Sequence, residues 1–260
     1  MKVFYEKAKV ISLKLINSRF LELVLENSNI AYNSRPGNFV LVKGWNTLDP
    51  ILARPFDIVQ RQRDAGQFSL VIKIEGRGTR LIGKLKENDF VYVTGPLGKP
   101  VLDFSGKRIG LLVRGVGAAA VVLLAEEANK NGIEVYTFLS ASSKDKLVCN
   151  DLLEKHSFIL EIATDDGSKG FKGDARDIVK KYLKRVSFDR FYTCGSKRFA
   201  RFIAELDKKN IAEGYLFLEN YMACGMGDCH GCAVKKANKN GYLLVCKDGP
   251  VFRSTDVEIQ

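Results

Sequence analysis

Three cysteines lie close together in residues 224–232, Cys-Gly-Met-Gly-Asp-Cys-His-Gly-Cys, in a chain of 260 residues that contains six cysteines. A fourth, Cys246, follows after thirteen intervening residues. Thiolates are soft, anionic ligands suited to iron and zinc. The glycines between them let the backbone bend closely and direct N–H groups at sulfur. The segment therefore indicates a metal centre held by Cys224, Cys229, Cys232 and Cys246.

The spacing of the cysteines favours one kind of centre. The pattern C-x4-C-x2-C-x13-C begins like the plant-type spacing that binds a [2Fe–2S] cluster, and we interpret the four cysteines as ligands of one such cluster. A structural zinc site and a disulfide pair remain alternatives. Zinc sites with four thiolates usually have two C-x2-C units, and this chain has one. Disulfides are rare in the cytosol, where we expect the protein to be.

Composition narrows the class of protein. No run of 18 apolar residues is present, and the alternating start MKVFYEKAKVISLKL lacks the apolar region of a signal peptide, so we expect a cytoplasmic protein without a membrane span. The net charge is +11, but no block of arginines interleaved with aromatic residues indicates nucleic-acid binding. A lysine-rich surface favours anionic cofactors and partners. The two histidines, His156 and His230, argue against histidine-based metal or triad chemistry.

The rest of the chain predicts the elements that position this centre. Residues 1–100 read as short alternating strands, which predicts a small antiparallel barrel with one short helix at 79–88. From residue 101 strands alternate with helices, including a helix at 144–155 and a last strand at 189–196, which predicts a parallel α/β sheet. From about 216 the chain becomes rich in glycine and cysteine. We therefore predict three domains: a barrel at 1–100, an α/β domain at 101–215 and a cluster domain at 216–260.

Three motifs in the first two domains are suited to bind nucleotides. Arg54-Pro55-Phe56-Asp57 offers an arginine for a phosphate and an aromatic ring for a flavin. Glu75-Gly76-Arg77-Gly78-Thr79 opens the short helix, where unpaired N–H groups can bind a pyrophosphate. Residues 115–120, Gly-Val-Gly-Ala-Ala-Ala, fit G-x-G-x-x-A after a strand. Alone, each of the first two is as typical of a turn or a helix N-cap.

Together these motifs resemble the ferredoxin-reductase flavoproteins. With the cysteine segment added, the chain resembles one branch, the electron-transfer subunits of NAD-linked dihydroorotate dehydrogenase, nearly from end to end. The resemblance rests on RPGNFV (35–40), RPFDI (54–58), GRGT (76–79), VTGPLG (93–98), ATDDGSKGFKG (163–173), FYTCGS (191–196), MACGMGDCHGCAVK (222–235) and CKDGPVF (246–252).

The resemblance implies FAD in the barrel, NAD(H) in the middle domain and electron transfer through the cluster. No catalytic residue is expected, because the substrate is oxidised in a partner subunit that binds FMN and dihydroorotate, in a heterotetramer that serves pyrimidine biosynthesis. The implied FAD contacts are Arg54 at the phosphate, Pro55, Phe56 and Asp57 at the isoalloxazine edge, Val71, Ile72 and Lys73 along the flavin, and Gly78 and Thr79 at the pyrophosphate. The implied NAD(H) contacts are Gly115, Gly117, Asp166, Cys194 and Gly195.

The sequence departs from this family at two places. In the nucleotide domain the family has a glycine where Arg114 stands, a proline at Ala120, and often glycine-x-arginine where Ser140-Ala141-Ser142 stands. Cys194 is also compatible with a small buried hydrophobic residue. At Asp57 the family has serine or threonine, whose hydroxyl can donate to flavin N5, whereas an ionised aspartate can only accept.

Two alternative functions follow from these departures. The chain could be the equivalent module of a different NAD(P)H- or ferredoxin-linked reductase complex. It could also be a redox sensor that uses its cluster and has a degenerate nucleotide site. The leading prediction is the electron-transfer subunit.

Overall fold

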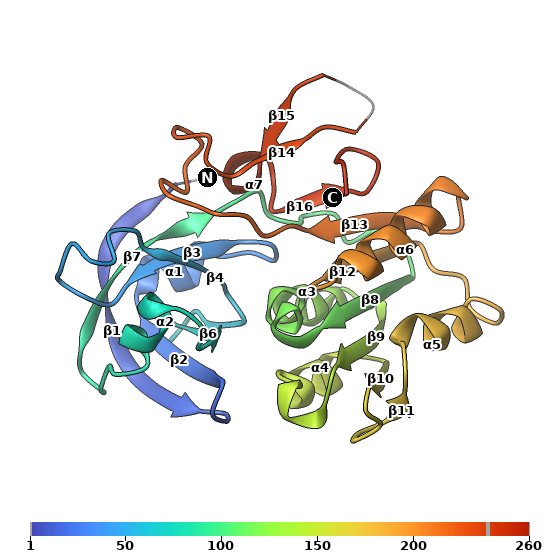
Figure 1. The fold of residues 1–260 in the computed structure, drawn as a ribbon, viewed down its shortest axis with the longest axis horizontal. Coiled ribbons are helices and arrows are strands. Elements are labelled where there is room, and N and C mark those ends of the chain that lie inside the picture. The colour runs from blue at the N-terminus through green and yellow to red at the C-terminus, as the bar shows by residue number, and fades with distance from the viewer. Residues whose placement is uncertain (1, 238–239, 260) are drawn as a thin grey trace.

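The computed structural model describes residues 2–237 and 240–259. It contains a curved antiparallel sheet, a parallel sheet with helices on both faces, and a C-terminal segment that lies across both sheets (Figure 1). The fold class predicted from the sequence is confirmed. No helix in the described residues is both long enough and apolar enough to cross a membrane.

The antiparallel sheet has the strand order β4-β3-β7-β1-β2-β6-β5. Alternating residues of its strands, such as Leu21, Leu23 and Leu25, are fully buried in the barrel core, as expected for strands with one face packed inward. The strands are β1 (Phe4–Leu15), β2 (Phe20–Glu26), β3 (Phe39–Lys43), β4 (Arg54–Asp57), β5 (Gln60–Gln62), β6 (Gln67–Lys73) and β7 (Phe90–Leu97).

Two short helices accompany this sheet, α1 (Ser28–Asn33) and α2 (Arg77–Ile82). The sequence analysis did not predict α1. The predicted bounds 79–88 of α2 are wrong: the helix begins two residues earlier and stops before Gly83. Its start is stabilised by Thr79, whose Oγ1 accepts the N–H groups of Glu75 and Gly76 at 3.0 and 3.1 Å.

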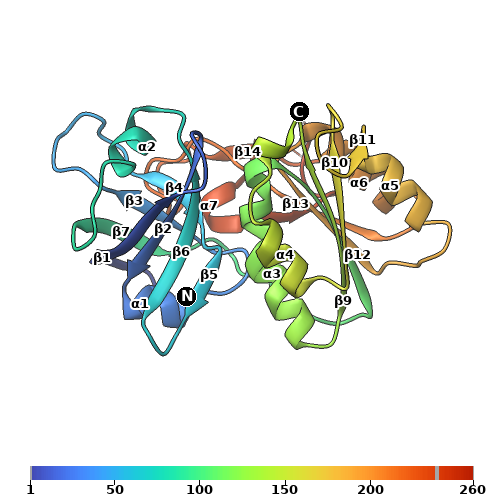
Figure 2. The same ribbon diagram turned by 90° about the horizontal axis from the view of Figure 1, so that it is seen from below.

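The second sheet has the order β11-β10-β9-β8-β12-β13-β16, parallel except for β16. Helices α3 and α4 pack on the face toward the barrel, and α5 and α6 on the opposite face (Figures 1 and 2). The elements are β8 (Arg108–Arg114), α3 (Ala119–Lys130), β9 (Glu134–Ala141), α4 (Asn150–His156), β10 (Ile159–Thr164), β11 (Phe171–Lys172), α5 (Ala175–Tyr182), β12 (Arg190–Cys194), α6 (Lys197–Lys208) and β13 (Glu213–Phe217), with 3-10 turns at Gly115–Ala118 and Lys144–Lys146.

Two predictions for this region are wrong. The helix expected at 144–155 is a 3-10 turn followed by α4, because Cys149 between them adopts a left-handed backbone with φ of 61°. The strand at 189–196 is not the last, since α6 and β13 follow it. The signal for α6 was present: Phe199, Phe202, Ile203 and Leu206 have helical spacing and are buried.

The C-terminal segment is bound to both sheets. It contains β14 (Ala233–Lys235), β15 (Tyr242–Leu244), α7 (Val245–Asp248) and β16 (Val251–Arg253). β16 pairs antiparallel with β13 and so completes the parallel sheet. On the other side, a Cβ placed on Gly225 would lie 2.8 Å from Leu41 and 2.9 Å from Leu97, so the cysteine loop packs directly on β3 and β7.

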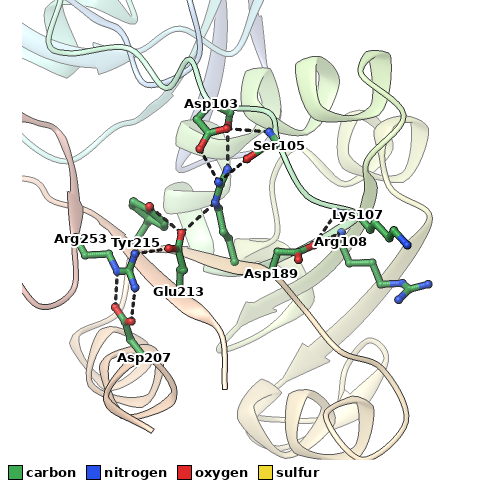
Figure 3. Close-up of polar contacts among 10 residues, drawn as sticks. Asp103, Ser105, Lys107, Arg108, Asp189, Asp207, Glu213, Tyr215 and Arg253 are labelled. Carbon is green, nitrogen blue, oxygen red and sulfur yellow. Dashed lines mark hydrogen bonds and ion pairs between the residues drawn. The ribbon is translucent and has the colours of Figure 1, made fainter. Parts of the chain in front are cut away.

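A network of charges joins the amino ends of β12 and β13 to their surroundings (Figure 3). Arg190 contacts Asp103 at 2.5 Å and Glu213 at 3.1 Å. Arg253 contacts Glu213 and Asp207, both at 2.7 Å. The network connects the linker after β7, the parallel sheet, α6 and β16, and so fixes the C-terminal segment on the sheet.

Candidate functional site

A cavity of about 650 Å³ lies where the antiparallel sheet, the start of α3 and the segment after β13 meet. The side chains that line it come from all three regions. From the sheet and α2 these are Phe39, Arg54, Pro55, Phe56, Asp57, Val71, Lys73, Glu75 and Thr79; from the other regions they are Val116, Ala119, Leu218, Glu219, Asn220, Tyr221, Met222 and Pro250.

Most of the residues predicted to hold FAD line this cavity, and two do not. Ile72 is fully buried in the barrel core because it points to the opposite face of β6 from its neighbours Val71 and Lys73. Gly78 lies against the Arg54 side chain, since a Cβ on Gly78 would come within 2.9 Å of Arg54 Nε. Ile72 and Gly78 can therefore contact a ligand in the cavity only through their backbone.

Arg54 is positioned to bind an anion. Its Nη1 donates to the carbonyl of Leu52 at 2.5 Å, and the guanidinium lies 5.8 Å from the Trp45 ring. Among the described residues, no carboxylate forms an ion pair with it. A guanidinium at a cavity wall that is oriented by a backbone hydrogen bond and has no carboxylate partner is suited to bind the phosphate of a flavin nucleotide.

Two carboxyl groups of the cavity wall lie near a thiol that lines the neighbouring cavity. The two carboxyl groups belong to Asp57 and Glu219, and Cys194 Sγ lies 3.7 Å from Glu219 Oε1. Burial, and then the charge of Glu219, raise the pKa of Asp57 to about 7. Burial, Glu219 and Asp57 raise the pKa of Cys194 well above its ordinary value. Near neutral pH, Asp57 is thus partly a neutral acid, which can donate a hydrogen bond that the ionised form cannot. The prediction from the sequence took into account only the ionised form of Asp57.

The four predicted ligand cysteines lie in the loop at 224–232 and in α7, where Cys224 contacts the backbone of Cys229 and Cys232 contacts Cys246. Cys224 Sγ accepts the backbone N–H groups of Met226 at 3.4 Å and Cys229 at 3.5 Å. Although burial raises it, these hydrogen bonds lower the pKa of Cys224 to about 6, which favours the thiolate that metal binding requires. Cys232 Sγ and Cys246 Sγ are buried and lie 3.2 Å apart.

This loop fits an iron–sulfur cluster by its donors and its backbone. Four cysteines and N–H groups aimed at sulfur are the arrangement such clusters use. No group of three or more His, Cys, Asp and Glu side chains within residues 2–237 and 240–259 converges to hold a single metal ion. A two-iron cluster distributes its thiolates over two irons, so convergence on one point is not required. His230 in the loop is exposed.

The residues predicted for NAD(H) lie at the carboxyl ends of the parallel strands. The turn containing Gly115 and Gly117 follows β8, and a Cβ on Gly117 would lie 2.7 Å from the backbone at Cys194 and Gly195. These residues are therefore brought together. Asp166 lies in the turn after β10, where its Oδ1 accepts the N–H and O–H of Ser168, which lowers the pKa of Asp166. Such an edge, beside a turn into a helix, fits a dinucleotide.

Two of the three departures in this domain, Arg114 and Ser140, are in direct contact. Arg114 Nη1 donates to Ser140 Oγ at 2.9 Å and to Asp165 Oδ1 at 3.2 Å, and Nη2 donates to Asp165 Oδ2 at 2.5 Å. Sequence reasoning treated Arg114 and Ser140 separately and did not identify Asp165. It also did not identify Glu219, because no motif marks it.

Comparison with known families agrees with this geometry. Residues 7–101 match a model described as an oxidoreductase FAD-binding domain, and residues 219–258 match the iron–sulfur cluster binding domain of dihydroorotate dehydrogenase B. The second match contains all four predicted ligand cysteines. The predictions of FAD and of an iron–sulfur cluster as cofactors are confirmed at the level of domains.

Several curated proteins with similar sequences are named dihydroorotate dehydrogenase B (NAD(+)), electron transfer subunit. The protein from Fusobacterium nucleatum is 34% identical over 86% of this chain and 87% of its own length. The protein from Desulforamulus reducens is 33% identical over 98% of both chains. The protein from Methanocaldococcus jannaschii, named as probable, is 35% identical over 85% of this chain and 80% of its own.

Solved structures show the same fold. An NADH-dependent reduced ferredoxin-NADP oxidoreductase, studied for flavin-based electron bifurcation, superimposes with a TM-score of 0.88 and 24% identity over 97% of this chain and 90% of that chain. The ferredoxin reductase of carbazole 1,9a-dioxygenase gives a TM-score of 0.69 and 17% identity over 82% of this chain and 69% of that chain.

Proposed function

Because the chain belongs to the family of electron transfer subunits of NAD(+)-dependent dihydroorotate dehydrogenase B, we propose that it carries electrons between NAD(H) and a separate catalytic subunit. One observation supports this most directly. The segment after β13 supplies Glu219, Tyr221 and Met222 to the cavity wall and continues without interruption into the cysteine loop. The same stretch of chain thus joins the proposed flavin site to the proposed cluster.

The residues of the cavity divide into those that bind and those that handle protons. Arg54 binds the FAD phosphate, and Val71 and Lys73 border the ring. FAD, when bound, takes up two electrons as a hydride and releases them singly, which a cluster can relay. Asp57 is partly protonated near neutral pH and can exchange a proton there, with Glu219 as the neighbouring charge.

The cluster ligands are Cys224, Cys229, Cys232 and Cys246. Gly225 packs on Leu41 and Leu97 of the barrel, and so the loop is held against the strands that flank the flavin site. The NAD(H) contacts are Gly115, Gly117, Asp166, Cys194 and Gly195. We retain the division into a flavin domain at 1–100, a nucleotide domain at 101–215 and a cluster domain at 216–260.

The partner is a catalytic subunit that oxidises dihydroorotate, with FMN as its flavin, in a cytoplasmic heterotetramer that serves pyrimidine biosynthesis. The exposed side chains of Tyr221 and Met226, 91% and 50% accessible, flank the cysteine loop, and we propose that this surface meets the partner. A module for a different reductase complex, or a redox sensor, is not favoured, because the similar curated proteins share the dihydroorotate dehydrogenase name.

The test uses the chain purified without air, alone and with a catalytic subunit from the same organism. Alone, it should contain FAD, two irons and two sulfides, lose flavin absorbance on addition of NADH, and leave dihydroorotate unchanged. The mixture should reduce NAD⁺ with dihydroorotate. Turnover of dihydroorotate by the chain alone would contradict the division of labour, and no response to NADH would contradict the nucleotide assignment.

A further inference from the structure

Arg114 stands at the point of the parallel sheet where nucleotides enter folds of this type. It is the last residue of β8, and β8 lies between β9 and β12. The chain passes from β8 outward to β9 and β10 and then returns to β12, so the strand order reverses beside β8 (Figure 1). Ligands of open α/β sheets bind outside the carboxyl ends of the strands at this reversal.

The guanidinium of Arg114 is held in a bidentate grip across three strands. Both its Nη atoms contact Asp165, at 3.2 and 2.5 Å, and Nη1 also contacts Ser140 at 2.9 Å. Asp165 follows β10, and Ser140 lies near the end of β9. These contacts hold the guanidinium at the carboxyl ends of β8, β9 and β10, with its two Nη atoms in the arrangement that binds an oxyanion bidentately.

The ion pair between Arg114 and Asp165 is exposed enough for another anion to replace Asp165. The Asp165 side chain is 45% exposed and that of Arg114 is 22% exposed. Ion pairs with this much access to water contribute little to stability. The turn at Gly115–Ala118 and α3 beyond it have no acidic residue in their first turns. Within the described residues, Asp165 is the carboxylate that forms an ion pair with Arg114.

We propose that Arg114 binds a phosphate of the dinucleotide, and that Asp165 holds the guanidinium until the phosphate replaces it. This inference rests on the proposed use of NAD(H). It gives Asp165 a defined role: the carboxylate orients Arg114 in the free protein and competes with the ligand for it. Loss of Arg114 and loss of the Asp165 charge should therefore change nucleotide affinity in opposite directions.

The test measures binding of ADP-ribose, which carries the pyrophosphate but cannot react with the flavin, to the FAD-loaded protein by calorimetry. Arg114→Gln should weaken binding at least tenfold, because a charge-assisted phosphate contact is lost. Arg114→Lys should be intermediate, because it keeps the charge and loses the fork. Asp165→Asn should tighten binding by up to about fivefold, the range of an exposed ion pair.

Arg108 provides the matched control. It is the first residue of the same strand and pairs with Glu134 of the neighbouring strand at the opposite end of the sheet. Arg108→Gln changes the net charge equally and should leave ADP-ribose affinity unchanged.

Three outcomes would overturn the proposal. Tighter binding of ADP-ribose by Arg114→Gln would show that the arginine obstructs the ligand, and unchanged binding by this variant would show that the arginine does not contact it. Weaker binding by both Arg114→Gln and Asp165→Asn would show that the ion pair has only a structural role. If Arg114→Gln does not fold, the signs for Arg114→Lys and Asp165→Asn decide. Failure of the wild type to bind ADP-ribose would contradict the proposed function as well, and so is distinguished from failure of this inference alone.

Discussion

The two ends of the parallel sheet both carry charged side chains but use them differently. At the amino ends, a chain of ion pairs with distances of 3.1 Å or less (Figure 3) runs from Arg190 to Glu213, from Glu213 to Arg253 and from Arg253 to Asp207. At the carboxyl ends, Glu219 faces the cavity and, within the described part of the chain, forms no ion pair. The pair formed by the buried Asp207 with Arg253 serves the fold, whereas the partly exposed pair of Arg114 and Asp165 at the carboxyl ends is the one proposed to exchange with a ligand. Acids beside a cavity without an ion-pair partner, such as Glu219, are typical of functional sites. The comparison predicts that substitutions at the amino ends change stability, whereas substitutions beside the carboxyl ends change cofactor binding.

The largest effect should follow from loss of a cluster ligand beside the carboxyl end. Cys232→Ser should remove the iron and acid-labile sulfide, because serine is a poor ligand for a cluster built on thiolates. Iron and sulfide analysis of anaerobic protein measures this, with Cys149→Ser as a control outside the loop. Full retention of iron and sulfide in Cys232→Ser would contradict the ligand assignment.

A change at the amino end should affect stability and leave cofactors in place. The Asp207 side chain is 4% exposed and accepts hydrogen bonds from Arg253 at 2.7 and 2.8 Å. Arg253→Ala leaves that charge buried, with hydrogen bonds from Ser254 and the backbone of Gly214 but without its cation. The change should lower the free energy of unfolding by roughly 3 kcal/mol. Denaturant unfolding measures this.

The exposed pair of Lys180 and Asp177, with side chains 59% and 52% exposed, supplies the control for that experiment. Lys180→Ala should change stability by less than about 0.5 kcal/mol. An equal loss in both variants, or loss of FAD and iron from folded Arg253→Ala, would break the distinction between the two ends.

An intermediate effect is expected where the barrel meets the cavity. Arg54→Gln removes the guanidinium proposed to bind the FAD phosphate and should weaken FAD binding about tenfold or more, since hydrogen bonds to charged groups contribute roughly 1.5–3 kcal/mol. Fluorescence titration of the apoprotein with FAD measures the dissociation constant. Arg80→Gln, on the exposed side of α2, is the control and should bind FAD normally. Equal affinities would place the phosphate elsewhere.

A further prediction concerns the pH dependence of stability. The folded pKa of Asp57, about 7, lies above the ordinary value of 3.8, so the folded state binds more protons between these values. The contribution of Asp57 to stability is therefore present below pH 4 and lost as pH rises through 7. Asp57→Asn should melt progressively higher than the wild type between pH 4.5 and 7.5, measured by scanning fluorimetry of the apoprotein.

Asp64, an exposed aspartate in the β5–β6 turn, gives the matched control, since Asp64→Asn should show no such trend. If the difference in melting temperature between Asp57→Asn and the wild type stays constant across the pH range, the pKa of the Asp57 carboxyl group is not raised in the folded protein. That result would also remove Asp57 as the proton-holding group of the cavity.

Much of the fold and of the site could be predicted from local patterns. The alternation in residues 1–100 and the strand–helix alternation from 101 depend on periodicity, which burial imposes directly on sequence. The element bounds were less accessible: α4 begins after Cys149 because that residue adopts a left-handed backbone. Helix α2 ends at Ile82, although Gly83 after it keeps a right-handed helical backbone. The missed helix α6 carried a helical pattern of buried residues, and so could have been predicted.

By itself, the sequence determined the donor chemistry: the four cysteines, Arg54 in its Arg-Pro-Phe-Asp motif and the glycine turn after β8 are local, and their spacing limits what they can bind. Only the tertiary structure decided which distant groups meet. It placed Glu219 against Cys194 at 3.7 Å, raised the pKa of Asp57 by burial, and joined Arg114 to Ser140 and Asp165. Proton affinities and ion pairs depend on distance and burial, and these are set where the chain returns to itself, not by neighbours in sequence.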